Sequence, residues 1–143
     1  APVGRTLLRL FGAKMGFRSM VYGTANVFAP WNLVVEDHSC IGPHVNVYNK
    51  DMIIVHDHSI VSQGAYLCSA SHDYTDSSHP LITKPIIIGP NVWIAADAFV
   101  GMGVEIGEGS IVGARAAVFK NVEPWSIVGG NPARFIKKRV IRK

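Results

Sequence analysis

Aliphatic residues return at every sixth position through the second half of the chain. The series runs through Ile88, Ile94, Val100, Ile106, Val112 and Val118. A small residue follows most of them, as in Ile88-Gly89 and Ile94-Ala95, until Phe119 ends the series. An α-helix would scatter a six-residue repeat around its surface, and glycines this frequent weaken a long strand. Short strands that end in tight corners fit the pattern, with the aliphatic side chain pointing inward.

Three such strands would close one coil of eighteen residues, and stacked coils would bury a continuous aliphatic column. The same period occurs upstream, first in one series and then in a second series that is shifted by two residues: Val35, Ile41, Val47 and Ile53, then Val55, Val61 and Leu67. The shift predicts a bulge near residues 49–51. A weaker continuation runs back to Phe17. We therefore predict an all-β fold, a parallel β-helix that occupies residues 17–123.

The interruption and the two ends of the repeat predict three further features. Leu67 and Ile88 are 21 positions apart, and the polar segment between them predicts an extended loop near residues 69–86. Residues 5–11 are amphipathic and favour a helix within an N-terminal cap segment, residues 1–16, over a membrane anchor. Asn131-Pro132 has the composition of a helix start, which predicts a short basic helix in the C-terminal segment, residues 124–143.

Length and composition agree with one domain and exclude several classes. The chain has 143 residues and 48% hydrophobic residues, enough for a core. It opens with Ala1 rather than Met, as a processed chain or a fragment does. No apolar run approaches a membrane span, and two cysteines fit reduced thiols in a cytoplasmic protein. The net charge of +4 is concentrated near the C-terminus, but no aromatic residues alternate with those cations, so nucleic-acid binding ranks last.

Three blocks of the sequence resemble a known family. They are Ser62-Gln-Gly-Ala-Tyr-Leu-Cys68, Ser71-His-Asp-Tyr74 and Pro124-Trp-Ser-Ile-Val-Gly-Gly-Asn-Pro-Ala133. Together with the repeats they resemble the hexapeptide-repeat acetyltransferases, in particular the colanic-acid-biosynthesis acetyltransferases, relatives of the maltose and galactoside O-acetyltransferases. The resemblance implies a left-handed coil. It also implies a homotrimer that holds acetyl-CoA between neighbouring subunits and requires no metal.

His72 matches the position of the catalytic base in this family. Its imidazole would remove the proton from an acceptor hydroxyl as that oxygen attacks the thioester carbonyl, a task suited to histidine near neutral pH. The alternative is a polar loop histidine without a role. The resemblance also implies weaker acceptor contacts from Asn46, Asp73 and Tyr74.

The resemblance implies a cofactor site made of one aromatic residue, two alanines and three cations. Ala96 and Ala114 are eighteen positions apart, so they would stack on consecutive coils and offer backbone amides to the pantetheine arm. The amide of Ala96 would also stabilise the oxyanion. The remaining matches are Trp93 near the thioester and Lys120, Arg134 and Lys137 near the phosphates. Lys137 replaces an arginine that is common in relatives, which weakens the case for a bidentate phosphate contact there.

These observations favour an acetyl-CoA-dependent O-acetyltransferase that acts on a hydroxyl of a sugar or polysaccharide precursor. Transfer would be direct in a ternary complex, because no cysteine or serine stands at a nucleophile position. N-acetylation of an amino sugar could use the same base. A zinc hydratase like the gamma-class carbonic anhydrases is a rival, since His38 and His58 could stack on successive coils, although a His-x4-His pair is absent. A non-catalytic binding scaffold is the third alternative.

Overall fold

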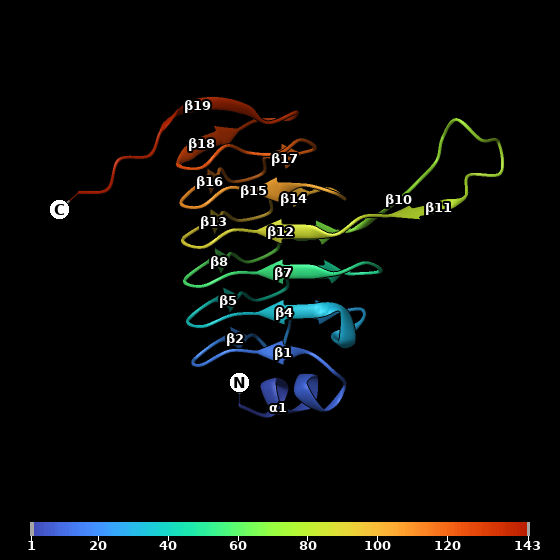
Figure 1. Cartoon of the computed structure of the whole chain (residues 1–143), viewed down its shortest axis with the longest axis vertical. Helices are drawn as coiled ribbons and strands as arrows, with labels where there is room; N and C mark the ends of the chain where they lie inside the picture. Colours follow the sequence, from blue (N-terminus) through green and yellow to red (C-terminus); the bar gives the residue numbers. More distant parts are fainter. Residues whose placement is uncertain (1, 143) are drawn as a thin grey trace.

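The computed structural model describes residues 2–142, which form a rod of stacked coils (Figure 1). Helix α1 (Pro2–Leu10) lies across one end of the rod, where Arg5 Nη2 and Arg9 Nη2 donate hydrogen bonds to the carbonyl oxygens of Gly16 and Met15. Among the described residues, no helix has both the length and the apolar character needed to cross a membrane.

Each coil contributes one short strand to each of three parallel sheets. The first sheet contains β1 (Lys14–Met15), β4 (Leu33–Val35), β7 (Ile53–Val55), β12 (Ile86–Ile88) and β15 (Glu105–Ile106). The second contains β2 (Met20–Val21), β5 (Cys40–Ile41), β8 (Ile60–Val61), β13 (Trp93–Ile94), β16 (Ile111–Val112), β18 (Ser126–Gly129) and, antiparallel, β19 (Arg134–Lys138). The third contains β3 (Asn26–Val27), β6 (Asn46–Tyr48), β9 (Tyr66–Cys68), β14 (Phe99–Val100) and β17 (Ala117–Val118). This arrangement confirms the predicted parallel solenoid.

The six-residue series forms the core, as predicted. The six aliphatic residues from Ile88 to Val118 are at most 2% exposed, and the upstream series from Val35 to Leu67 is equally buried. Its weaker continuation to Phe17 is wrong, because Phe17 is 62% exposed and Met15 and Val21 point inward instead. The register explains the error: Asn26 pairs with Asn46 twenty positions on, whereas Phe99 pairs with Ala117 eighteen positions on.

The extra residues of the early coils lie at the corner between the third sheet and the first. Residues 49–52 turn this corner in one coil, and the 3-10 helix η1 (Pro30–Asn32) turns it in the coil before. The side chain of Asn49 is fully buried there and bonds Ala29 N at 2.8 Å, Ala29 O at 2.7 Å and Asn32 O at 3.0 Å. A buried amide therefore joins the two enlarged corners.

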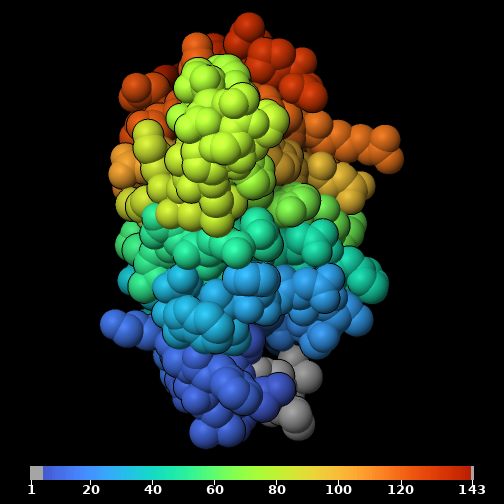
Figure 2. Space-filling model, turned by 90° about the vertical axis from the view of Figure 1, so that its right-hand side faces the viewer, coloured from blue at the N-terminus to red at the C-terminus, as the bar shows by residue number. Residues whose placement is uncertain are grey.

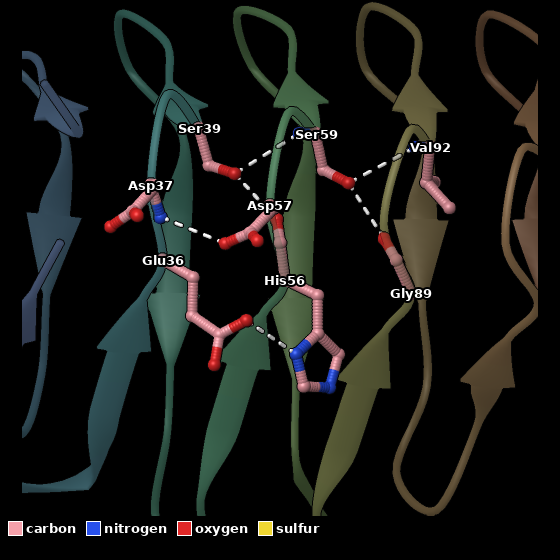
Figure 3. A network of polar contacts seen from close by, with 8 residues as sticks. All are labelled: Glu36, Asp37, Ser39, His56, Asp57, Ser59, Gly89 and Val92. Carbon is pink, nitrogen blue, oxygen red and sulfur yellow. Dashed lines mark hydrogen bonds and ion pairs between the residues drawn. The ribbon is translucent and has the colours of Figure 1, made fainter. Parts of the chain in front are cut away.

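At another corner, buried serines connect successive coils (Figure 3). Ser59 Oγ donates to Gly89 O at 2.6 Å and accepts from Val92 N at 3.0 Å, while Ser39 Oγ accepts from Ser59 N at 3.0 Å. The residue preceding each serine, His38 or His58, has a positive φ of 58°. Each serine thus satisfies backbone groups that the tight corner withdraws from the strand pairing.

The predicted C-terminal basic helix is wrong. The chain turns through a cis Asn131–Pro132 peptide bond and returns as β19, which pairs antiparallel with β18. β18 is the last parallel strand of its sheet, and without β19 its outer backbone groups would face solvent unpaired. Pairing satisfies these groups, whereas a helix of about eight residues is too short to be stable alone.

The segment predicted as an extended loop contains a two-stranded antiparallel hairpin. β10 (Ala70–His72) pairs with β11 (Leu81–Thr83), and His72 lies opposite Leu81. Figure 1 shows this hairpin arm, residues 70–83, reaching away from the coils, and Figure 2 shows it standing in front of them in yellow-green. From Ser71 to Pro85 every residue except the half-buried Asp73 is exposed, so the chain's own coils leave the arm uncovered.

Candidate active site

The imidazole of His72 is held by the backbone of its own arm. His72 Nδ1 lies 2.7 Å from the carbonyl oxygen of His79, on the opposite side of the hairpin. A carbonyl oxygen can only accept a hydrogen bond, so Nδ1 carries the hydrogen in this contact. In the neutral ring Nε2 then has the free lone pair, which is the form required of a general base. Sequence reasoning missed the role of His79, although the His79-Pro80 dipeptide signals a turn there.

Asp73 and Tyr74 follow His72 into the tip of the arm. The Asp73 carboxylate accepts hydrogen bonds from Thr75 N at 3.0 Å and from Thr75 Oγ1 at 2.5 Å. These bonds hold the pKa of Asp73 below its usual value, chiefly through the side chain of Thr75. Tyr74 is 88% exposed. The carboxylate thus organises the tip and makes no hydrogen bond to His72, and acceptor binding by either residue stays a prediction.

A cavity of about 230 Å³ lies where the arm leaves the coil. It is lined by Ala70, Ser71, Phe99, Gly101, Met102 and Phe119. Ser71 immediately precedes His72, and both phenylalanines belong to the third sheet and its corner. The base of the arm therefore opens onto the outer face of that sheet.

Ala96 and Ala114 occupy the same corner on consecutive coils, as predicted. Arg115 N donates to Ala96 O at 2.9 Å, and each alanine precedes a residue with positive φ, Asp97 at 58° and Arg115 at 61°. Within residues 2–142, neither alanine's own N–H donates a hydrogen bond. The corner thus presents two free backbone donors, one above the other, and the methyl side chains leave them accessible.

Trp93 lies on the outer face of β13, the strand that leads directly into this corner, and is 46% exposed. Its Nε1 donates to Ser62 Oγ at 2.9 Å, which fixes the plane of the ring. The serine was not identified from the sequence. Because β8 and β13 are adjacent in the sheet, a residue of one strand can orient its neighbour, but the spacing of 31 positions along the chain gives no local signal.

The structure brings two of the three predicted cations together. Lys120 and Arg134 both line a cavity of about 270 Å³ at the C-terminal end of the rod, together with residues that include Phe119 and Phe135. Lys137 lies further along β19. A register irregularity in β19 sets Arg134 opposite Gly129 and Lys137 opposite Ile127. Since those partners are two residues apart on β18, Arg134 and Lys137 share one face of the sheet.

Asn46 lies on the outer face of the third sheet, between Asn26 and Tyr66. Its Oδ1 accepts a hydrogen bond from Asn26 Nδ2 at 3.2 Å. The same face carries Phe99 and Phe119 at the base of the arm. Acceptor binding by Asn46 stays a prediction.

The two histidines that the zinc alternative invokes lie together on successive coils. The rings of His38 and His58 stack with centroids 4.9 Å apart, as expected for histidines on successive coils. Nearby, His56 Nδ1 contacts Glu36 Oε1 at 2.7 Å (Figure 3). Across the described part of the chain, no three His, Cys, Asp or Glu side chains come close enough to hold a metal ion.

Comparisons with known proteins show the family to which this fold belongs. The family described as bacterial transferase hexapeptide (six repeats) matches residues 85–120. The chain is 42% identical over 134 residues to Escherichia coli K12 WcaF, named as a colanic acid biosynthesis acetyltransferase; the match covers 94% of this chain and 74% of that protein. It is 53% identical over 53 residues to an Escherichia coli chloramphenicol acetyltransferase, covering 37% of this chain and 25% of that protein.

A solved structure extends the likeness over the whole rod. The hexapeptide-repeat acetyltransferase VCA0836 of Vibrio cholerae, complexed with acetyl-CoA, is 28% identical with a TM-score of 0.89. The match covers 96% of this chain and 78% of that one.

Proposed function

Because the chain belongs to the hexapeptide-repeat acetyltransferase family, we propose that it transfers an acetyl group from acetyl-CoA to a hydroxyl group of a sugar or polysaccharide precursor. Membership confirms three expectations: the chain is an acyltransferase, its co-substrate is acetyl-CoA, and its coil is a left-handed parallel β-helix. The sugar acceptor rests on the name of WcaF, which concerns a polysaccharide.

One contact carries the proposed mechanism, the 2.7 Å bond between His72 Nδ1 and the carbonyl oxygen of His79. It leaves Nε2 free to take the proton of an acceptor hydroxyl while that oxygen forms a bond to the thioester carbon. As the C–S bond breaks, the imidazolium returns the proton to the leaving sulfur of CoA. Transfer is direct and needs no acetyl-enzyme.

The free amides of the alanine corner supply the remaining polar groups of the reaction. The N–H of Ala96 donates to the oxyanion that forms as the hydroxyl attacks, and the N–H of Ala114 binds the pantetheine arm. Trp93 packs against the thioester end. Lys120, Arg134 and Lys137 neutralise the phosphates of CoA at the C-terminal end of the rod.

The site is completed by a second copy of the chain. His72 stands on an arm that reaches away from the coils, whereas the alanine corner and the cations belong to the rod (Figure 1). In the proposed homotrimer, the arm of one subunit closes over the groove that the next subunit provides. The uncovered surface of the arm supports this arrangement.

The proposal is tested by following CoA release with a thiol-trapping dye, using a panel of sugars and nucleotide sugars. His72→Ala should lower turnover by about 10²- to 10⁴-fold and leave acetyl-CoA binding intact. His79→Asn is the matched control: it removes the other histidine of the arm but keeps the carbonyl acceptor, and asparagine tolerates the positive φ of 49°. Equal turnover in wild type and His72→Ala would show that His72 is not the base. Turnover with amino sugars alone would show that the reaction is N-acetylation and not O-acetylation.

A further inference from the structure

The outer face of the third sheet carries five aromatic rings in two contacting groups. We call it the aromatic face, and it consists of Phe28, Tyr48, Tyr66, Phe99 and Phe119. In one group Phe28 and Tyr48 touch edge to face, with ring centroids 5.1 Å apart. In the other group Phe99 contacts both Tyr66 and Phe119, with centroid separations of 5.5 Å and 5.8 Å. Phe28, Tyr66 and Phe119 are 52%, 38% and 58% exposed. The chain's core does not need these rings, because the inward positions of the same strands are filled by valine and leucine.

Amide side chains stand directly beside the lower rings. Asn26 and Asn46 line a shallow cavity of about 440 Å³ together with Phe28, Tyr48 and Tyr66. Apart from the bond between the two amides, Asn26 Oδ1 and Asn46 Nδ2 have no hydrogen-bond partner within residues 2–142. The cavity therefore combines flat apolar walls with unused donors and acceptors, a combination typical of small-molecule sites.

Lys50 stands at the rim of this cavity. Its Nζ lies 5.0 Å from the ring centroid of Phe28 and 5.9 Å from that of Tyr48. The ammonium group adds a charged donor next to the rings. A ligand with an apolar ring face and many hydroxyl groups matches this set.

The second sheet offers a contrast that indicates which face packs against another subunit. Its outer face is apolar over most of its length, with Met20, Cys40, Ile60, Ile111 and Ile127 beside Trp93. Met20 and Ile60 are 44% and 49% exposed, and no amide pair interrupts them. A contiguous apolar surface without hydrogen-bonding side chains suits a protein–protein contact. The aromatic face, with its polar groups set between rings, suits a polar ligand better.

We propose that the aromatic face binds a saccharide chain, so that the acceptor is an oligosaccharide and not a single sugar. The inference rests on the proposed function and specifies its substrate class. Sugar rings stack their C–H faces on the aromatic rings, while their hydroxyls bond Asn26 and Asn46. From β3 to β14 the face crosses three inter-strand steps of about 4.8 Å, about 14 Å in all, which exceeds one sugar ring.

The aromatic face extends to the hairpin arm that carries His72. Its upper rings, Phe99 and Phe119, line the cavity where the arm leaves the coil, together with Ser71, the residue before His72. A chain bound along the lower rings would thus present its end toward the arm. This continuity assigns the cavity between Asn26 and Tyr66 as a distal subsite that recognises the part of the acceptor that does not react.

The test is a binding experiment that does not depend on turnover. Wild type, His72→Ala, Phe28→Leu, Tyr48→Leu and Phe17→Leu are applied to an array of bacterial glycans, from monosaccharides to octasaccharides of exopolysaccharides and lipopolysaccharide cores. Leucine keeps an apolar contact but removes the flat ring, so it separates sugar stacking from protein packing. Phe17 is a matched control because it is 62% exposed on another part of the rod.

We expect wild type, His72→Ala and Phe17→Leu to bind the same oligosaccharides. Phe28→Leu and Tyr48→Leu should each bind about tenfold more weakly. The inference is overturned if only monosaccharides bind, if no glycan binds, or if the two leucine variants match wild type. It is also overturned if either variant changes the oligomeric state in light scattering, since the face would then be a subunit contact. Glycan binding by His72→Ala without turnover in wild type would contradict the proposed reaction alone.

Discussion

Replacing Ala96 by proline should abolish the proposed oxyanion donor without disturbing the fold. Proline already occupies the same position of this corner two coils earlier: the carbonyls of Pro43, Gln63 and Ala96 each accept a hydrogen bond from the next coil, at 3.0, 3.1 and 2.9 Å. Pro90 and Pro124 stand likewise before residues of positive φ, at another corner. The native chain thus shows that proline fits this backbone.

The size of the effect follows from what Ala96→Pro removes. The N–H of Ala96 has no partner in the described chain, so its loss breaks no internal bond, and the free energy of unfolding should change by less than about 1 kcal/mol. If that N–H donates to the oxyanion, kcat should fall by about 10²- to 10³-fold, which corresponds to about 2.7–4 kcal/mol of transition-state stabilisation. The KM for acetyl-CoA should change little.

Steady-state kinetics with thiol detection and urea unfolding measure the two quantities. Ala96→Val is the control for bulk, because valine adds a similar volume but keeps the N–H. Ala114→Pro provides the second comparison: this amide is assigned to the pantetheine arm, so its loss should raise the KM and spare kcat. The reasoning is refuted if Ala96→Pro retains wild-type kcat, or if Ala96→Val loses as much as Ala96→Pro.

Three further predictions concern the framework of the site. Asn49→Asp should lower the free energy of unfolding by at least about 2 kcal/mol at pH 7, because the buried carbonyl of Ala29 and the half-buried carbonyl of Asn32 lose their donor and face a carboxylate. The folded state would raise the pKa of that carboxyl, so the penalty should shrink as urea midpoints are measured toward pH 4. Gly109→Ala should lower the thermal midpoint, because a Cβ there would lie 2.3 Å from the Trp125 ring and φ is +73°; an unchanged midpoint would contradict the packing. Asp73, whose pKa is lowered, should keep its bonds to Thr75 until the pH falls below 3.8, visible as a late titration of the Thr75 amide in NMR spectra.

The coil could be predicted because its cause is local and repeated. An inward side chain every six residues leaves a direct record in the sequence, and the positions from Val35 to Val118 follow it. The error at Phe17 arises because a coil of twenty residues is not a multiple of six, so the six-residue series loses its register there. By contrast, no local sequence pattern predicts that residues 134–138 return as β19. This return depends on the open edge of β18, which exists only once the coils have stacked.

The candidate site likewise has features that the sequence predicts and features that it does not. Ala96 and Ala114 could be paired from their spacing alone, because one coil separates them. The support of His72 by His79, and of Trp93 by Ser62, depends on contacts across strands that the sequence does not pair. The sequence pattern also did not predict the aromatic face, because its rings occupy outward positions, where the six-residue repeat places no constraint.

The position of the hairpin arm follows from which corner of the coil can vary. The inward column fixes the strands, and the corner of the free alanine amides keeps the same tight turn in successive coils. Among the coils of residues 2–142, only the corner between the third sheet and the first changes size. It holds η1, then residues 49–52, then the whole arm, and later the short turn after Val100. An insertion there leaves the column intact because it points into solvent. The variable corner therefore carries His72, the proposed base, while the invariant corner carries the free backbone donors. Under the proposed mechanism, acceptor choice can change through the arm without altering how acetyl-CoA is held.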